Sequence, residues 1–77
     1  MSRVLIYGAG QTGEQVYRQI RDSHEVVGFL DGNTDKKGQR IGNVNIIGGV
    51  DALSGDLEYD RIIIASFFLE RYQAPFA

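Results

Sequence analysis

The sequence predicts a single α/β domain that is built around a parallel β-sheet. Three segments rich in apolar and β-branched residues support this prediction, namely residues 1–7, 25–30 and 61–65. Apolar runs of this kind are typical of strands that are buried on both faces of a parallel sheet. Between the first two runs, Val16 and Ile20 recur at helical spacing. Alternation of strand and helix is the pattern of an α/β fold.

A glycine-rich segment follows the first predicted strand, because residues 8–13 read G-A-G-Q-T-G and match the pattern G-x-G-x-x-G. Gly8 can take the backbone angles of a tight turn from strand to helix. Gly10 leaves room for a pyrophosphate to approach the main chain, and Gly13 lets the helix lie close to the strand. The first N–H groups of a helix lack partners and carry partial positive charge, so this turn favours a bound anion.

The context of the glycine pattern strengthens this interpretation. A strand precedes it, a helix of about residues 11–21 follows it, and Asp31 stands 18 residues after Gly13, at the end of the second strand. Together these features predict a Rossmann-like nucleotide-binding site, whereas a glycine pattern alone can be a simple turn. A carboxylate at this place accepts hydrogen bonds from ribose hydroxyls and repels a 2′-phosphate, which favours NAD over NADP. Asp31 can also cap the turn of residues 31–34, and the two roles are compatible.

The predicted site combines the glycine turn with the ends of the second and third strands. Its cofactor-binding residues are Gly8, Gly10, Gln11, Thr12, Gly13, Asp31, Gly32, Asn33, Ala65 and Ser66. Small residues at the end of the third strand leave room for a nucleotide, and the hydroxyl of Ser66 can contact it or cap a following helix. No acid/base pair stands near the turn, so we predict no catalytic residue and expect that the domain catalyses nothing alone.

The remaining charged residues are predicted to face solvent. The cluster of Lys36, Lys37 and Arg40 can reach a phosphate, but a solvated loop is the simpler interpretation. The acidic residues between 51 and 60 lack the glycine position of a calcium loop, so we predict no metal site. His24 lies at the far end of the first helix from the glycine turn and is interpreted as a loop residue.

The whole sequence predicts a partial Rossmann-like parallel sheet of about three main strands with flanking helices. The predicted strand order is 3-2-1, which places the strand of residues 61–65 beyond the second strand. Residues 44–47 form a brief strand or an extended link, and residues 50–54 form a short helix that ends at Gly55. Gly28, inside the second strand, indicates a close backbone approach or packing against a helix.

Composition limits the classes of function. The chain has 77 residues, a net charge of −2 and no cysteine. These values argue against a disulfide scaffold, a thiolate metal site and the broad basic field of a nucleic-acid-binding protein. No apolar stretch approaches the ~20 residues of a membrane span, and the N-terminus does not resemble a signal peptide. We therefore expect a soluble cytoplasmic domain without nucleic-acid or membrane contact.

Apolar residues are dense near the end of the sequence, where they are Phe67, Phe68, Leu69, Tyr72 and Phe76. Large apolar surfaces in proteins are usually covered by something. A full Rossmann fold has two mononucleotide-binding halves, and residues 1–77 supply one of them. We therefore expect this single domain to form a homo-oligomer or to be a fragment of a larger protein.

Four stretches carry a resemblance to a known family, namely V-L-I-Y-G-A-G-Q-T-G, V-V-G-F-L-D, K-K-G-Q-R-I-G-N-V-N-I-I-G and D-R-I-I-I-A. Across residues 3–66 the sequence resembles the N-terminal Rossmann-like domain of bacterial polysaccharide-biosynthesis proteins of the nucleoside-diphosphate-sugar 4,6-dehydratase/epimerase type. The resemblance implies a Rossmann-like fold and nucleotide binding, and related domains are described as binding NAD, CoA or a nucleotide sugar. We expect an NAD-type dinucleotide because of the glycine pattern and Asp31. It also implies that the parent protein is an NAD-dependent nucleotide-sugar dehydratase, epimerase or dehydrogenase.

Two alternatives remain open. The sequence is also similar to the N-terminal nucleotide-sugar-binding domain of sialic-acid-type sugar O- and N-acyltransferases, which implies a UDP-sugar as the ligand. The other alternative is a domain that senses CoA or NAD without chemistry. The family pattern is broken after Asp31, because Gly32, Asn33 and Thr34 stand where an acidic pair and a proline are expected. The Tyr-x-x-x-Lys pattern of short-chain dehydratases is absent, so no catalytic residue is carried over.

Overall fold

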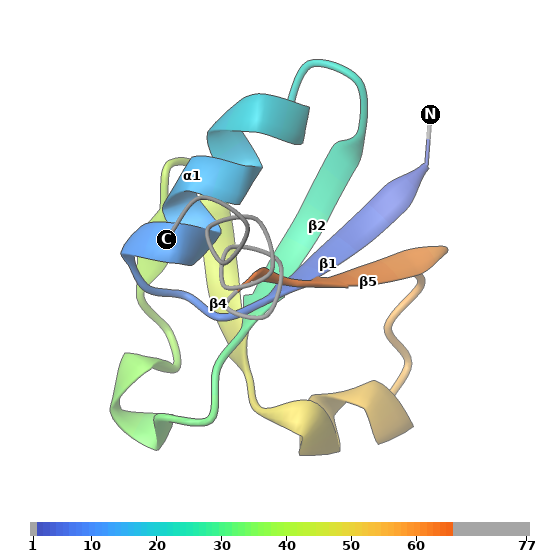
Figure 1. The fold of residues 1–77 in the computed structure, drawn as a ribbon. Helices are drawn as coiled ribbons and strands as arrows, with labels where there is room; N and C mark the ends of the chain where they lie inside the picture. Colours follow the sequence, from blue (N-terminus) through green and yellow to red (C-terminus); the bar gives the residue numbers. More distant parts are fainter. Residues whose placement is uncertain (1, 66–77) are drawn as a thin grey trace, which may run out of the picture.

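A computed structural model of the chain describes residues 2–65 and shows a five-stranded sheet with one α-helix in that range (Figure 1). The elements, with η for a 3-10 helix, are β1 (Arg3–Tyr7), α1 (Gln11–Ile20), β2 (Glu25–Leu30), η1 (Thr34–Lys36), β3 (Arg40–Ile41), β4 (Val44–Gly48), η2 (Val50–Ser54) and β5 (Arg61–Ile64). The helix α1 crosses one face of the sheet. Both 3-10 helices lie at the lower end of the sheet in Figure 1, near the carboxyl ends of β2 and β4.

The predicted α/β class is confirmed, because four neighbouring strands of the sheet run parallel. The order across the sheet is β3-β4-β2-β1-β5, and only β3 is antiparallel to its neighbour. Several predicted bounds agree closely with the structure. The second strand has the predicted residues, α1 ends within a residue of the prediction, and η2 ends before Gly55 as expected.

The predicted strand order is wrong. The strand of residues 61–65 was expected beyond β2, but β5 pairs with the opposite edge of β1, with Ile64 opposite Tyr7. The place beside β2 belongs to β4, where Ile46 lies opposite Phe29. The physical reason is that β4 occupies the edge of β2 that faces away from β1, so β5 pairs with the open edge of β1 and satisfies its backbone hydrogen-bonding groups. The segment interpreted as a brief strand or an extended link is thus a full member of the sheet.

The hydrophobic core forms where α1 packs on the central strands. Val4, Leu5 and Ile6 of β1 are fully buried, as the unbroken apolar run predicts. On the helix side, Phe29 is fully buried, and its ring meets the ring of Tyr17 edge-on at 5.8 Å between centroids. This geometry is favourable for an aromatic pair and fixes α1 against β2.

Two glycines permit the closest approaches in the domain. A Cβ at residue 13 would overlap the carbonyl oxygen of Gly8, so α1 can lie against the end of β1 only because residue 13 has no side chain. A Cβ at residue 28 would overlap the Ile47 side chain on β4. The approach at Gly13 was predicted from the sequence, and the structure confirms it. At Gly28 the sequence predicted a close backbone approach or packing against a helix, but the neighbour is the Ile47 side chain of the adjacent strand.

We predict that Gly13→Ala lowers the free energy of unfolding by about 2–3 kcal/mol, because the added methyl group would force the helix away from a rigid carbonyl group. Denaturation with urea measures this change. Gly55→Ala is the matched control, because the backbone there is extended and a Cβ would meet only ordinary contacts. The control should change stability by less than about 0.5 kcal/mol. Equal effects of the two substitutions would contradict the prediction.

Candidate functional site

The turn between β1 and α1 is built by the glycines of the G-x-G-x-x-G pattern. Gly8 has a φ of 111°, a value that L-residues with side chains rarely adopt, so the chain can reverse directly after Tyr7. The Gly8 N–H donates to the Leu30 carbonyl at 2.7 Å, which ties the turn to the end of β2. Gly10 is the N-cap of α1 and supplies no side-chain oxygen to the first N–H groups of the helix. These groups and the helix dipole make the turn locally positive.

A pocket of about 320 Å³ opens beside this turn, at the carboxyl ends of β1 and β2. The residues that line it are Tyr7, Gly8, Gly10, Gln11, Thr12, Gly13, Asp31 and Lys36. Six of the predicted site residues are therefore brought together. Ligands of open α/β sheets bind outside the carboxyl ends of parallel strands, so the pocket lies where such a site is expected.

The Asp31 carboxylate connects the two halves of the site. One oxygen, Oδ2, accepts a hydrogen bond from the Ala9 N–H at 2.8 Å, and the other, Oδ1, accepts one from the Asn33 N–H at 2.8 Å. The second bond is the turn cap that the sequence offered as an alternative role for Asp31. Hydrogen bonds from Asn33 and Ala9 favour the ionised form and lower the pKa of Asp31 below its usual value. The carboxylate therefore stays charged at neutral pH and is a poor general base.

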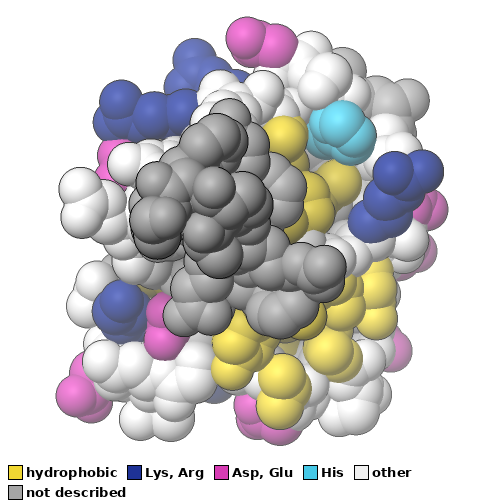
Figure 2. Space-filling model, viewed as in Figure 1, with side chains coloured by type: hydrophobic (Ala, Val, Ile, Leu, Met, Phe, Trp, Pro, Cys, Tyr) yellow, Lys and Arg dark blue, Asp and Glu magenta, His cyan; other side chains and the backbone are white. Residues whose placement is uncertain are grey.

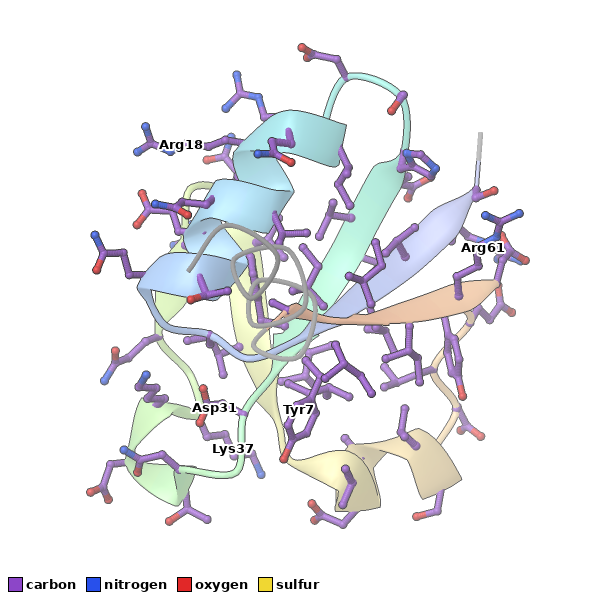
Figure 3. All side chains as sticks on the ribbon, in the orientation of Figure 1. Tyr7, Arg18, Asp31, Lys37 and Arg61 are labelled. Carbon is purple, nitrogen blue, oxygen red and sulfur yellow. The ribbon has the colours of Figure 1, made fainter. Side chains whose placement is uncertain are left out.

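Lys36 differs from the other two residues of the basic cluster, for all of which a solvated loop was the preferred interpretation. Its ammonium nitrogen lies 3.7 Å from Asp31 Oδ2, and its side chain is 32% exposed. Lys37 and Arg40 are exposed, as a solvated loop predicts. Figure 3 shows Asp31 at the end of β2 and labels Lys37 on the loop that follows. Lys36 thus lines the pocket, whereas its two basic neighbours do not line it.

The local structure of the loop explains this difference. Asn33 caps η1, because its Oδ1 accepts a hydrogen bond from the Asp35 N–H at 3.0 Å. The single turn of 3-10 helix brings the third residue of η1, Lys36, back towards Asp31. An Asx cap at Asn33 after the Asp31 turn was the signal in the sequence that could have identified Lys36.

The other predicted site residues lie elsewhere. Gly32 is exposed, and a Cβ on it would stand 3.3 Å from the Tyr7 hydroxyl. Asn33 acts as the cap of η1, and Ala65 is buried in the core beside α1; neither lines the pocket. Ser66 lies outside the residues that the structure describes. Tyr7 lines the pocket but was not predicted, although its position directly before the glycine turn at a strand's carboxyl end could have identified it.

Residues 2–65 contain neither a candidate membrane-spanning helix nor a candidate metal cluster. No helix there has the length and apolar character that crossing a membrane requires. In the same range, no three histidine, cysteine or acidic side chains are grouped closely enough to hold a metal ion.

Fold and site together define an α/β domain with a mostly parallel sheet, in which the first strand-to-helix turn is glycine-rich and opens into a pocket. The chain belongs to the family described as C2185-like, N-terminal, whose model matches residues 1–72. A comparison with curated proteins found no match. The function of the site therefore has to be argued from its own geometry and chemistry.

The role of Asp31 predicts how stability depends on pH. The folded-state pKa is lowered, so the ionised carboxylate stabilises the fold above its unfolded pKa of about 3.9. This contribution is lost as the pH falls through the lower folded-state pKa. Asp31→Asn should therefore cost about 1–3 kcal/mol at pH 7, because an amide cannot accept from two N–H groups on opposite sides. The cost should shrink below about pH 4, which urea denaturation at a series of pH values would measure.

The matched control for this prediction is Asp35→Asn, which removes an exposed carboxylate on the same loop. We expect the control to change stability by less than about 0.5 kcal/mol at every pH. A cost of Asp31→Asn that stays constant from pH 7 to pH 3 would contradict a role for the ionised group.

Proposed function

We propose that the chain is a Rossmann-like nucleotide-binding domain that holds an NAD-type dinucleotide at the glycine turn and catalyses nothing alone. We place it in a cytoplasmic protein of polysaccharide biosynthesis, of the nucleoside-diphosphate-sugar epimerase or dehydratase type that its sequence resembles. The order of the parallel strands supports the proposal. Numbered along the chain, β4, β2, β1 and β5 stand in the order 3-2-1-4, as in the first part of a doubly wound dinucleotide-binding sheet.

The observation that carries the proposal is the difference between the three glycines of the turn. Gly8 is required by its positive φ, and Gly13 is required by its contact with the Gly8 carbonyl. Gly10 has a φ of −96°, which any residue adopts, and the described protein does not crowd the place of its Cβ. The folded domain therefore gives no reason for a glycine at residue 10. A pyrophosphate that approaches the main chain does give one.

A UDP-sugar is the second candidate ligand, and the state of Asp31 favours it. Both carboxylate oxygens already accept backbone hydrogen bonds, which leaves fewer lone pairs for the two hydroxyls of an adenine ribose. A ligand that is held mainly through its diphosphate needs fewer hydrogen bonds to this carboxylate. The domain would then resemble the nucleotide-sugar-binding part of a sugar acyltransferase.

A panel of thermal shifts with NAD, NADP, CoA and UDP-GlcNAc tests the proposal. A ligand at 100 times its dissociation constant stabilises the fold by about 2.7 kcal/mol, which corresponds to roughly ten degrees for a small domain. We expect NAD to give the largest shift and to exceed NADP, because Asp31 repels a 2′-phosphate. Gly10→Val should abolish the shift, because its side chain would fill the space of the pyrophosphate.

The melting temperature of Gly10→Val without ligand shows that loss of the shift comes from the site and not from unfolding. Outside nearby chain atoms, a Cβ at residue 10 would meet only Lys36 Nζ, at 3.8 Å, at the end of a flexible side chain. Valine is a poorer N-cap than glycine by about 1 kcal/mol, so the variant should melt less than about ten degrees below the unchanged chain. Full binding by Gly10→Val would place the site elsewhere, and absence of any shift across the panel would refute nucleotide binding.

The self-association was expected through the edge of the sheet or through residues 67–76, which lie outside the described part of the chain. A hydrophobic surface on the face of the sheet opposite α1 is the interface that we propose instead. Figure 2 shows hydrophobic side chains gathered over β5 and η2. A groove of about 230 Å³ is lined there by Tyr7, Leu30, Val50, Leu53, Ile62 and Ile64. Two large apolar residues of this groove are well exposed to solvent, namely Val50 at 61% and Ile64 at 52%. Exposed apolar patches of this kind commonly mark interfaces, so we propose that a second copy of the chain covers this one.

Sedimentation velocity at micromolar concentration tests this proposal. We expect a dimer for the unchanged chain and a monomer for Ile64→Glu, because an isologous interface would bring two carboxylates into an apolar contact. Glu25→Gln is the control, since this exposed residue starts β2 at the far end of the sheet from the groove. A stable monomer of the unchanged chain would contradict self-association.

A further inference from the structure

Lys36 has two described neighbours that define its place in the pocket. Its ammonium nitrogen lies 3.7 Å from Asp31 Oδ2. It also lies 3.8 Å from the place where a Cβ on Gly10 would stand, and apart from nearby chain atoms no other described atom comes within 4 Å of that place. Any group that approaches the main chain at Gly10 must therefore come close to this ammonium.

The contact between Lys36 and Asp31 does not by itself explain the position of the lysine. Two backbone N–H groups already stabilise the carboxylate, and they lower its pKa more than Lys36 does. The distance of 3.7 Å exceeds that of a direct charge-assisted hydrogen bond, which is usually about 2.7–2.9 Å. Partly exposed ion pairs of this kind contribute little to stability. Lys36 is therefore free to exchange this partner for another anion.

We propose that Lys36 donates directly to the phosphate of a nucleotide diphosphate that lies over Gly10, and so makes the site selective for that group. The inference rests on the proposed nucleotide-binding function and names the residue that recognises the phosphate. The N–H groups at the start of α1 supply partial charges from one side, and Lys36 supplies a full positive charge from the other. Asp31 holds Lys36 near this place and leaves its ammonium accessible.

Selectivity for the diphosphate follows from this arrangement. A nucleoside without phosphate gains nothing from Lys36, whereas a diphosphate gains a charge-assisted hydrogen bond. The effect of the lysine should thus appear only in the part of the affinity that the phosphates provide. A lysine that served only to neutralise Asp31 would instead affect the fold, and would affect both ligands equally.

NMR titration of the full chain with ADP and adenosine, and with UDP and uridine, tests the inference and covers affinities into the millimolar range. Lys36→Gln should weaken binding of the preferred diphosphate at least tenfold, and should change the affinity for its nucleoside by less than about twofold. Lys37→Gln, on the neighbouring exposed residue, should change neither affinity by more than about twofold. Lys36→Arg should retain most of the affinity for the diphosphate. Melting of each variant without ligand would confirm that the fold is intact.

The outcomes separate this inference from the function on which it rests. If the unchanged chain binds a diphosphate and Lys36→Gln leaves that affinity intact, the role of Lys36 is wrong and nucleotide binding stands. Equal weakening of diphosphate and nucleoside would show that Lys36 acts through the structure of the loop and would also overturn the inference. If the unchanged chain binds none of the four ligands, the nucleotide site and the role of Lys36 are both refuted.

Discussion

The close approach of α1 to the end of β1 is the constraint on which the rest of the structure depends. It is possible because residue 13 has no Cβ and can lie against the carbonyl oxygen of Gly8. The positive φ of Gly8 turns the chain sharply enough to start the helix there. As a result, the first N–H groups of α1 lie at the carboxyl end of β1, beside the end of β2. Packing and the electrostatic character of the pocket therefore have one common cause.

Asp31 extends this constraint to the second strand. Its carboxylate lies between the Ala9 N–H of the glycine turn and the Asn33 N–H of the loop after β2. The turn and the loop therefore share one ionised acceptor, and each holds the other in place. The same loop carries η1, which places Lys36 in the lining of the pocket. One carboxylate thus orders the wall of the pocket and balances the positive charge beside it.

Local features of this domain were predictable from the sequence, whereas the pairing of distant segments was not. The bounds of β2 and η2 follow from apolar runs and glycine stops that act within a few residues. The glycine turn and Asp31 come together because the spacing of the pattern defines one strand-to-helix unit. The place of β5 depends on which edge of β1 remains after β2 has paired, and apolar content alone does not decide this. Lys36 and Lys37 likewise look alike in sequence, and only the backbone of η1 separates them.

Of the three glycines of the turn, two are explained by the fold itself, and the third is explained only by the proposed ligand. A positive φ explains Gly8, and a backbone contact explains Gly13, so each would be needed even in a domain that bound nothing. Neither reason applies at Gly10, where the backbone is extended and a side chain would meet only the end of Lys36. The glycine at residue 10 is thus the one of the three that the fold leaves unexplained, and the proposed ligand would explain it. Helix N–H groups and the Lys36 ammonium border that place, which favours an anion as the proposed ligand.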